Sequence, residues 1–249
     1  MARKQEKYVF VNKQPGETPL EALERYRATR TELKGAPMTY AGRLDPMAEG
    51  TLLVLFGDEC KNKDKYLGLD KEYEVEVVFG IATDTYDALG LATLGPARSA
   101  LEEVLPPKID LAKYIDKFTQ EYPPYSSKTV AGAPLHELAR AGDLPDEMPT
   151  KDVEIYSMSQ IGERHVSAEL LKKEILAKIS MVRGDFRQEE IRARWNDLLD
   201  QPGTGFNAIK FKVKCSSGTY MRSLADQMGK DAGAGAFALA IKRVKILLK

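Results

Sequence analysis

The sequence predicts an α+β protein with a mixed sheet, because strand-like and helix-like segments alternate irregularly along its 249 residues. Two segments, residues 71–79 and 206–215, alternate with a period of two and are predicted as half-buried strands. In the first, apolar side chains share one face and glutamates share the other. A third observation is the strong helix start at residues 18–21, where Thr, Pro and Glu form the pattern of a capping box.

The remaining elements follow from the same patterns. Strands are predicted over residues 8–11, 51–56, 71–79, 153–161, 206–215 and 239–248. Helices are predicted over residues 18–33, 58–69, 135–140, 167–181, 187–199 and from 219 to about 229. Leu20, Leu23 and Tyr26 are expected to form the buried stripe of the first helix. Residues 95–118 resemble two short helices joined by prolines, and residues 121–150, rich in Pro, Gly, Ser and Lys, form a long excursion from the core.

Composition indicates an ordinary globular protein. Apolar residues make up 43% of the chain and charged residues 30%. No run approaches the ~18 apolar residues of a membrane span, and the first seven residues lack the apolar core of a signal peptide. Cys60 and Cys215, like His136 and His165, lack disulfide or metal-ligand spacing. We therefore expect a cytoplasmic protein that needs no metal.

Charge is segregated along the chain, although 37 basic residues balance 37 acidic ones. Residues 206–249 contain nine basic and two acidic side chains, a local balance of +7. Acidic side chains gather elsewhere, as in residues 143–154. Such segregation would let a neutral protein offer a basic surface to a polyanion such as RNA. A solvated basic face is the simpler interpretation of the charge run by itself.

The segment most informative about function is residues 40–50, Tyr-Ala-Gly-Arg-Leu-Asp-Pro-Met-Ala-Glu-Gly. Asp45 lies between a basic segment and an apolar run, and Pro46 pushes it toward extended geometry. Gly42 and Gly50 permit unusual dihedrals or the close approach of a ligand. The pattern predicts a carboxylate that is presented rather than hidden, whereas an Asp-Pro pair alone indicates no more than a turn.

This segment resembles the catalytic loop of the pseudouridine synthases. Residues 42–45 alone also resemble the branch that modifies ribosomal RNA, whereas residues 45–50, with the pattern Asp-Pro-x-Ala-x-Gly, resemble the TruB branch. Further segments resemble TruB in the same order, over most of residues 8–248. That family converts a uridine in the TΨC arm of transfer RNA, at tRNA position 55, to pseudouridine without a cofactor. The resemblance implies the pseudouridine synthase fold, with a central mixed, largely antiparallel sheet crossed by a cleft.

The resemblance assigns catalytic roles to three side chains. Asp45 is implied as the nucleophile that forms a temporary covalent link to the substrate, by attack at either C1′ or the base. Arg222, in a Gly-Thr-Tyr-x-Arg segment, matches the arginine that keeps the nucleophile charged and oriented; a phosphate-binding surface residue is the alternative. Tyr73, in a Lys-x-Tyr-x-Val strand, matches the tyrosine that stacks on uracil; a core aromatic is the alternative.

The resemblance also implies contacts to the substrate RNA. The predicted residues are Lys13, Tyr40, Arg43, Lys61, Lys128, Tyr220, Ile241 and Arg243. Tyr40 stands where typical TruB proteins have a His that enters the RNA loop, and Ile241 matches an apolar residue that packs near the base or in the core. Residues 121–150 resemble the thumb that grips RNA, which is expected to become ordered on binding. Residues 167–200 form a helical segment longer than is usual in the family.

We predict a single catalytic domain over residues 1–249, with no room for the C-terminal PUA domain of many TruB proteins. The predicted partner is transfer RNA, bound through its T-arm by a monomer without metal, cofactor or membrane. Two alternatives are a pseudouridine synthase acting on ribosomal RNA and a catalytically silent RNA-binding or RNA-folding protein. The Asp-Pro-x-Ala-x-Gly ending disfavours the first, and the complete set of Asp45, Tyr73 and Arg222 disfavours the second.

Overall fold

The computed structural model describes residues 7–95, 107–200 and 205–248. Its main sheet consists of β1 (Tyr8–Lys13), β2 (Met38–Ala41), β3 (Glu49–Phe56), β4 (Asp70–Phe79), β7 (Asp116–Glu121), β10 (Thr150–Ser167), β11 (Gly205–Cys215) and β12 (Ala236–Leu247). Two small hairpins pair β5 (Ile81–Thr83) with β6 (Ala92–Leu94) and β8 (Thr129–Val130) with β9 (Ala133–Pro134). The helices are α1 (Pro19–Ala28), α2 (Lys63–Leu67), α3 (Leu135–Ala141), α4 (Ala168–Met181), α5 (Gln188–Leu199) and α6 (Met221–Asp231).

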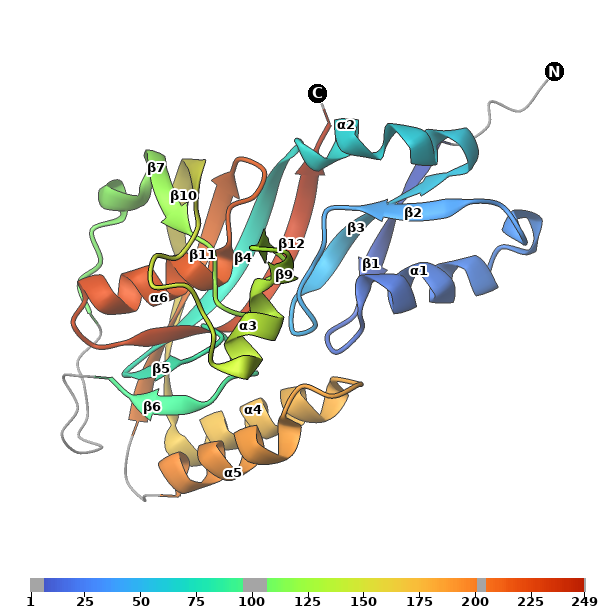
Figure 1. The fold of residues 1–249 in the computed structure, drawn as a ribbon. Helices are drawn as coiled ribbons and strands as arrows, with labels where there is room; N and C mark the ends of the chain where they lie inside the picture. The colour runs from blue at the N-terminus through green and yellow to red at the C-terminus, as the bar shows by residue number, and fades with distance from the viewer. Residues whose placement is uncertain (1–6, 96–106, 201–204, 249) are drawn as a thin grey trace.

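The main sheet has the strand order β1-β3-β12-β4-β11-β10-β7, with β2 beside β3 (Figure 1). Among the described strands, β3 and β12 pair in parallel and the other neighbours are antiparallel. Helices flank this sheet, so the predicted α+β class with a mixed, largely antiparallel sheet is confirmed. No helix in the described part of the chain is long and apolar enough to span a membrane.

The start of α1 forms as its sequence predicts. The Thr18 side chain accepts a hydrogen bond from the Glu21 N–H, and the Glu21 carboxylate accepts one from the Thr18 N–H at 2.7 Å. These two bonds satisfy backbone groups that a helix leaves open at its N-terminus. The buried stripe differs from the prediction, because Leu23 and Ala22 are buried whereas Leu20 is 57% exposed.

Three predictions of secondary structure need correction. The first helix ends at Ala28, and the predicted helix over residues 58–69 is a 3-10 turn followed by the short helix α2. Part of the two helices predicted over residues 95–118 lies outside the described residues; the remainder contains a 3-10 turn, Leu111–Tyr114, and the beginning of β7. Strand β7 has the polar sequence DKFTQE, and its pairing with β10 is a long-range contact that local propensity does not show.

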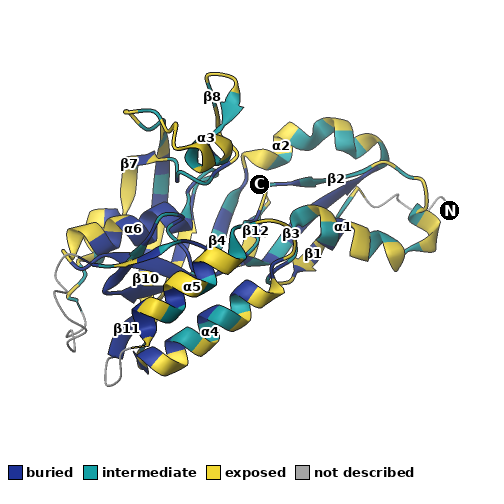
Figure 2. Ribbon diagram, turned by 60° about the horizontal axis from the view of Figure 1, so that its bottom comes forward, coloured by how far each residue is buried: buried dark blue, intermediate teal, exposed yellow. Residues whose placement is uncertain are grey.

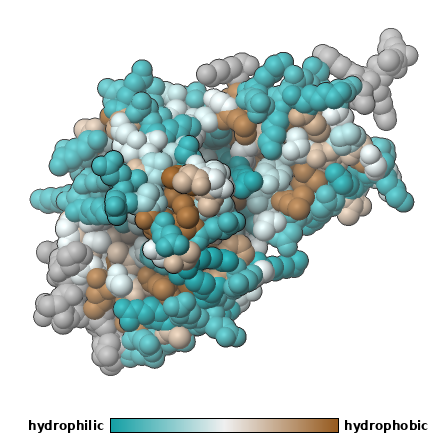
Figure 3. Space-filling model, in the orientation of Figure 1, coloured by the Kyte–Doolittle hydropathy of each residue, from teal (hydrophilic) through white to brown (hydrophobic). Residues whose placement is uncertain are grey.

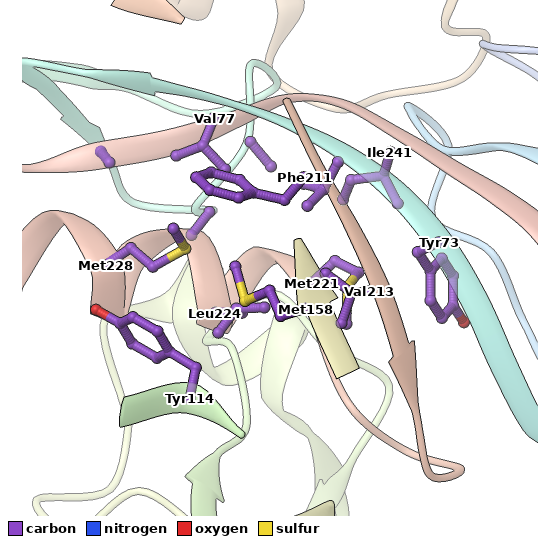
Figure 4. Close-up of a cluster of buried hydrophobic side chains, with 14 of the residues drawn as sticks. Tyr73, Val77, Tyr114, Met158, Phe211, Val213, Met221, Leu224, Met228 and Ile241 are labelled. Atoms are coloured by element: carbon purple, nitrogen blue, oxygen red, sulfur yellow. The ribbon is translucent and has the colours of Figure 1, made fainter. Parts of the chain in front are cut away.

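Two hydrophobic cores support the region around the cleft. Figure 4 shows the first, in which side chains of the sheet meet α6; its labelled members include Tyr73, Val77, Phe211, Ile241, Met221, Leu224 and Met228. The second lies where α4 and α5 pack around the fully buried Trp195. Both helices turn buried residues inward and exposed residues outward (Figure 2).

The unit formed by β1, β2, β3 and α1 joins the rest of the sheet through the short parallel pairing of β3 with β12. Gly50 pairs with Arg243 in that register. Gly50 has a φ of +103°, and a Cβ there would lie 2.3 Å from the backbone oxygen of Arg243. Glycine is therefore required at this position, both for the backbone conformation and for the approach of β12. This contact fixes the strand that follows the Asp45 loop.

Candidate active site

Asp45 lies in the loop between β2 and β3, at the wall of a cavity of about 630 Å³. The Ala48 N–H donates to the Asp45 backbone oxygen at 3.0 Å, which closes a tight turn. The side chain of Asp45 remains 36% exposed. Tyr73, Arg222 and Ile241 line the same cavity. The structure therefore brings the predicted catalytic residues together from the Asp45 loop, β4 and α6, with the predicted substrate contact Ile241 from β12.

Arg222 holds the Asp45 carboxylate with two hydrogen bonds. Its Nε donates to Oδ2 of Asp45 at 2.8 Å and its Nη2 to Oδ1 at 3.0 Å, while its Nη1 donates to the Thr85 carbonyl at 2.9 Å. The side chain is only 3% exposed. Burial disfavours the charged guanidinium, but Asp45 and Asp87 outweigh this and raise the pKa of Arg222. The bidentate geometry fixes the orientation of the Asp45 carboxylate.

Asp87 is a further carboxylate at this site, and sequence reasoning missed it. Its Oδ2 lies 3.8 Å from the Arg222 Nε, while its Oδ1 accepts hydrogen bonds from the Thr85 hydroxyl at 2.8 Å and the Leu89 N–H at 2.9 Å. Burial raises the pKa of Asp87 to about 6, although Arg222 opposes this. The available signal was the polar Asp-Thr-Tyr-Asp run between β5 and β6, which resembles an ordinary turn.

Tyr73 and Ile241 form an apolar part of the cavity wall. Both are largely buried and both belong to the core cluster beneath the cleft. Burial raises the pKa of Tyr73, so its phenol stays neutral near pH 7. Tyr220 also lines the cavity, and burial raises its pKa to about 12. Tyr73 is thus both a core aromatic and a wall of the site, so the two interpretations of it are compatible.

Lys13 and Arg243, both predicted from the sequence to contact RNA, lie beneath the Asp45 loop; Arg243 also lines the cavity, whereas Lys13 does not. Arg243 is 1% exposed and donates to the backbone oxygens of Thr51, Arg43 and Gly42 at 2.6, 3.2 and 3.1 Å. Lys13 has no exposed surface, donates to two other carbonyls of the loop region, and has its pKa lowered to about 8 by burial. Carbonyl oxygens that point inward hold these cations, so both side chains support the loop.

The other predicted RNA-binding residues occupy different surroundings. Tyr40 and Arg43 line the cavity, and the Lys63 ammonium lies 5.3 Å from the Tyr40 ring centre. Lys61 lies outside the cavity lining and forms an exposed ion pair with Asp58 at 2.7 Å. Lys128 lies on the predicted thumb, with its ammonium 5.3 Å from the centre of the Tyr122 ring.

The described residues contain no group of three or more His, Cys, Asp or Glu side chains arranged to hold a metal ion. What they do offer is a carboxylate fixed by a buried guanidinium, beside an aromatic and an aliphatic wall. This arrangement suits nucleophilic attack on a ligand whose flat, uncharged ring is bound against these walls. A cleft of this kind across a mixed sheet matches the pseudouridine synthase class that the sequence resembles.

Comparison with known proteins supports this class. The model of the TruB family pseudouridylate synthase N-terminal domain matches residues 30–186. The chain therefore belongs to the TruB family of pseudouridylate synthases. A chain in the crystal structure of a Cbf5-Nop10-Gar1 complex superposes with a TM-score of 0.56 at 14% identity, over 96% of this chain and 48% of that one. The superposition shows a shared fold.

Curated relatives are similar to nearly the whole of this chain. The tRNA pseudouridine synthase B of Xanthomonas campestris pv. campestris is 29% identical over 225 residues, which cover 90% of this chain and 59% of that protein. The tRNA pseudouridine synthase B of Nitratidesulfovibrio vulgaris is 31% identical over 239 residues, which cover 94% of this chain and 61% of that protein. The chain thus spans about three fifths of the length of these relatives.

Proposed function

We propose that the chain isomerises uridine to pseudouridine in the T-arm of transfer RNA, with Asp45 as the nucleophile. The observation that carries this proposal is the bidentate pair between Asp45 and the buried Arg222, with bonds of 2.8 and 3.0 Å. Because the Asp45 side chain is still 36% exposed, it can reach a substrate while Arg222 keeps it oriented. The cavity of about 630 Å³ falls within the size range of ligand pockets.

The proposed reaction breaks the bond from C1′ to N1 of uridine, turns the base, and forms a bond from C1′ to C5. The carboxylate of Asp45 forms a transient covalent bond, at either C1′ or the base, and is released when the new carbon–carbon bond is complete. The proton on C5 then leaves and N1 gains one, so the reaction is an isomerisation with no net oxidation. Arg222 stays bound to the carboxylate, and the walls formed by Tyr73 and Ile241 hold the uracil ring.

The choice of transfer RNA is supported by the curated relatives, which are named tRNA pseudouridine synthase B. A uridine in a folded loop must be extruded to reach Asp45, at a cost of a few kcal/mol. Tyr40 and Arg43 line the cavity and offer stacking and phosphate contacts that offset this cost. The proposal includes a cytoplasmic monomer of one catalytic domain that needs no metal or cofactor.

The test is to incubate a T-arm stem-loop with the protein and to map pseudouridine along it. We expect one modified uridine, and we expect Asp45→Asn to abolish the reaction while RNA binding persists. Asp58→Asn is the matched control, because Asp58 is 94% exposed and lies outside the cavity lining. Equal activity of wild type and Asp45→Asn contradicts the nucleophile; modification of a ribosomal RNA fragment alone contradicts the substrate. RNA binding without any reaction by the wild type supports the silent RNA-binding alternative.

A further inference from the structure

A second part of the cavity wall is formed by residues that the sequence did not predict as catalytic. It is formed by Tyr125, His136 and Arg140 of the thumb segment and by Phe186 and Arg187 of the connection between α4 and α5. We call these five residues the outer wall. It lies close to the Asp45 site, because the Arg222 Nη2 that binds Asp45 also donates to the Tyr125 carbonyl at 3.3 Å.

Contacts between the thumb segment and the α4–α5 connection make the outer wall continuous. The Arg140 Nη2 donates to the Asp185 carbonyl at 2.6 Å. The Arg187 guanidinium lies 4.5 Å from the centre of the Tyr125 ring and forms an ion pair with Asp84 at 2.9 Å. In Figure 3 hydrophobic residues gather near the middle of the face that is drawn, ringed by hydrophilic ones.

The hairpin holds its side of the outer wall in place. Phe186 packs against the hydrophobic core of the hairpin while it also lines the cavity. From α5, the Trp195 indole N–H donates to the Ala88 carbonyl at 3.1 Å and the Arg194 Nε donates to the Ala92 carbonyl at 2.6 Å. Helix α5, which follows the connection, is thus tied to the segment that carries Asp87, and a wall held by such a helix loses little conformational entropy when it binds a ligand.

The chemistry of the outer wall suits a nucleotide. Phe186 and Tyr125 offer aromatic rings, on which a base of any sequence can stack. Arg140 bonds to a neutral carbonyl, so that contact leaves its charge available to a phosphate, whereas Arg187 shares its charge with Asp84. The carboxylates among the described cavity-lining residues are Asp45 and Asp87, and both face Arg222 rather than the outer wall.

We propose that the outer wall binds one nucleotide of the RNA loop next to the target uridine, with its base on Phe186 and its phosphate on Arg140. This inference rests on the proposed function, because it takes the uridine at Asp45 as its reference point. The α4–α5 connection then acts as a second gripping element opposite the thumb. The ligand is a single-stranded nucleotide that is recognised by stacking and charge, and not by the hydrogen-bond donors and acceptors on the edge of its base.

The test pairs a protein change with an RNA change. A series of stem-loops carries one abasic nucleotide each, at every loop position except the target. Fluorescence anisotropy gives the dissociation constant of each stem-loop for two proteins, Asp45→Asn and the double variant Asp45→Asn, Phe186→Leu. Leucine keeps an apolar side chain against the hairpin core but offers no ring. At one position we expect the abasic change to weaken binding about tenfold with Phe186 present and less than about twofold with leucine. With Phe186→Trp in place of Phe186→Leu, the abasic change at that position should again weaken binding about tenfold.

Phe10→Leu is the matched control, since Phe10 is a half-exposed phenylalanine on β1 that does not line the cavity. The outer-wall proposal is overturned if, at every loop position, the abasic nucleotide weakens binding equally with phenylalanine, leucine and tryptophan at position 186. Failure of the proposed function has a different signature, namely no pseudouridine formed by the wild type in the unmodified stem-loop. Thermal unfolding checks that each variant is folded, and only variants with a cooperative transition are compared in binding.

Discussion

Two buried arginines bind the Asp45 loop, and they do so in different ways. Arg222 comes from α6 and contacts two side-chain carboxylates, Asp45 at 2.8 Å and Asp87 at 3.8 Å. Arg243 comes from β12 and contacts three backbone carbonyls of the loop and of β3. The first guanidinium is matched by charge, whereas the second satisfies acceptors that the backbone cannot satisfy by itself.

The comparison teaches that burial of an arginine does not define its role. A guanidinium paired with an exposed carboxylate controls the group that reacts, so its loss should affect the chemical step. A guanidinium bound to carbonyls controls where the loop lies, so its loss should affect the stability of the fold first. Three substitutions test whether each group acts on the chemical step or on the stability of the fold.

The largest effect is expected from Arg222→Gln. The change leaves Asp45 and Asp87 close together without their shared cation. We expect the rate of pseudouridine formation in single-turnover experiments to fall about 10³-fold, as when one preorganised charge is removed from an active site. Arg192→Gln, at a half-buried position of α5 outside the cavity lining, is the control and should leave the rate unchanged. A decrease smaller than about tenfold contradicts the proposed role, because such a change does not need an essential cation.

Arg243→Gln should act mainly on stability. The shorter, neutral side chain cannot reach all three carbonyls, and buried carbonyls without donors destabilise the folded state. We expect the free energy of unfolding in urea to fall by about 4 kcal/mol, with the rate per folded molecule reduced less than in Arg222→Gln. The control is Lys245→Gln, an exposed neighbour on β12. A rate loss as large as that of Arg222→Gln, without destabilisation, would erase the distinction between the two arginines.

A smaller effect should appear in the pH dependence of Asp87. Burial raises the pKa of this carboxyl from 3.8 to about 6 in the folded protein, so the folded state takes up the proton before the unfolded chain does. The contribution of Asp87 to stability therefore becomes more favourable as the pH falls from about 6 to about 4. The free energy of unfolding of wild type, minus that of Asp87→Asn, should rise by about 2 kcal/mol over that range. A difference that stays constant with pH contradicts the raised pKa.

Local patterns predicted much of this molecule. The alternation in β4 and β11 and the capping box at Thr18 are local signals, and both strands and the helix start form where the sequence indicates. Strand β7 was missed because its polar sequence becomes a strand only through β10. The family resemblance placed Asp45, Tyr73 and Arg222 at one site, and the structure brings them to one cavity.

The remaining site residues depend on contacts that a linear pattern does not contain. Lys13 and Arg243 look like surface cations in the sequence, and their burial follows from inward-pointing carbonyls distant along the chain. Asp87 looks like a turn residue, and its importance follows from the distance to Arg222. The side chain of a lysine in a strand can be exposed to solvent or buried among backbone carbonyls, and the tertiary fold decides between the two.

The parallel pairing of β3 with β12 joins segments that are synthesised far apart in time, so the Asp45 loop can be fixed only after β12 has been made. The Arg243 side chain donates to the carbonyl of Thr51, 192 positions earlier in the chain, and Gly50 accepts the close approach of β12. A nascent chain therefore exposes the Asp45 loop long before the strand that holds it has left the ribosome. Contacts between such distant segments form late in folding. A chain released before β12 would carry Asp45 and Arg222 but would lack the strand that fixes the Asp45 loop.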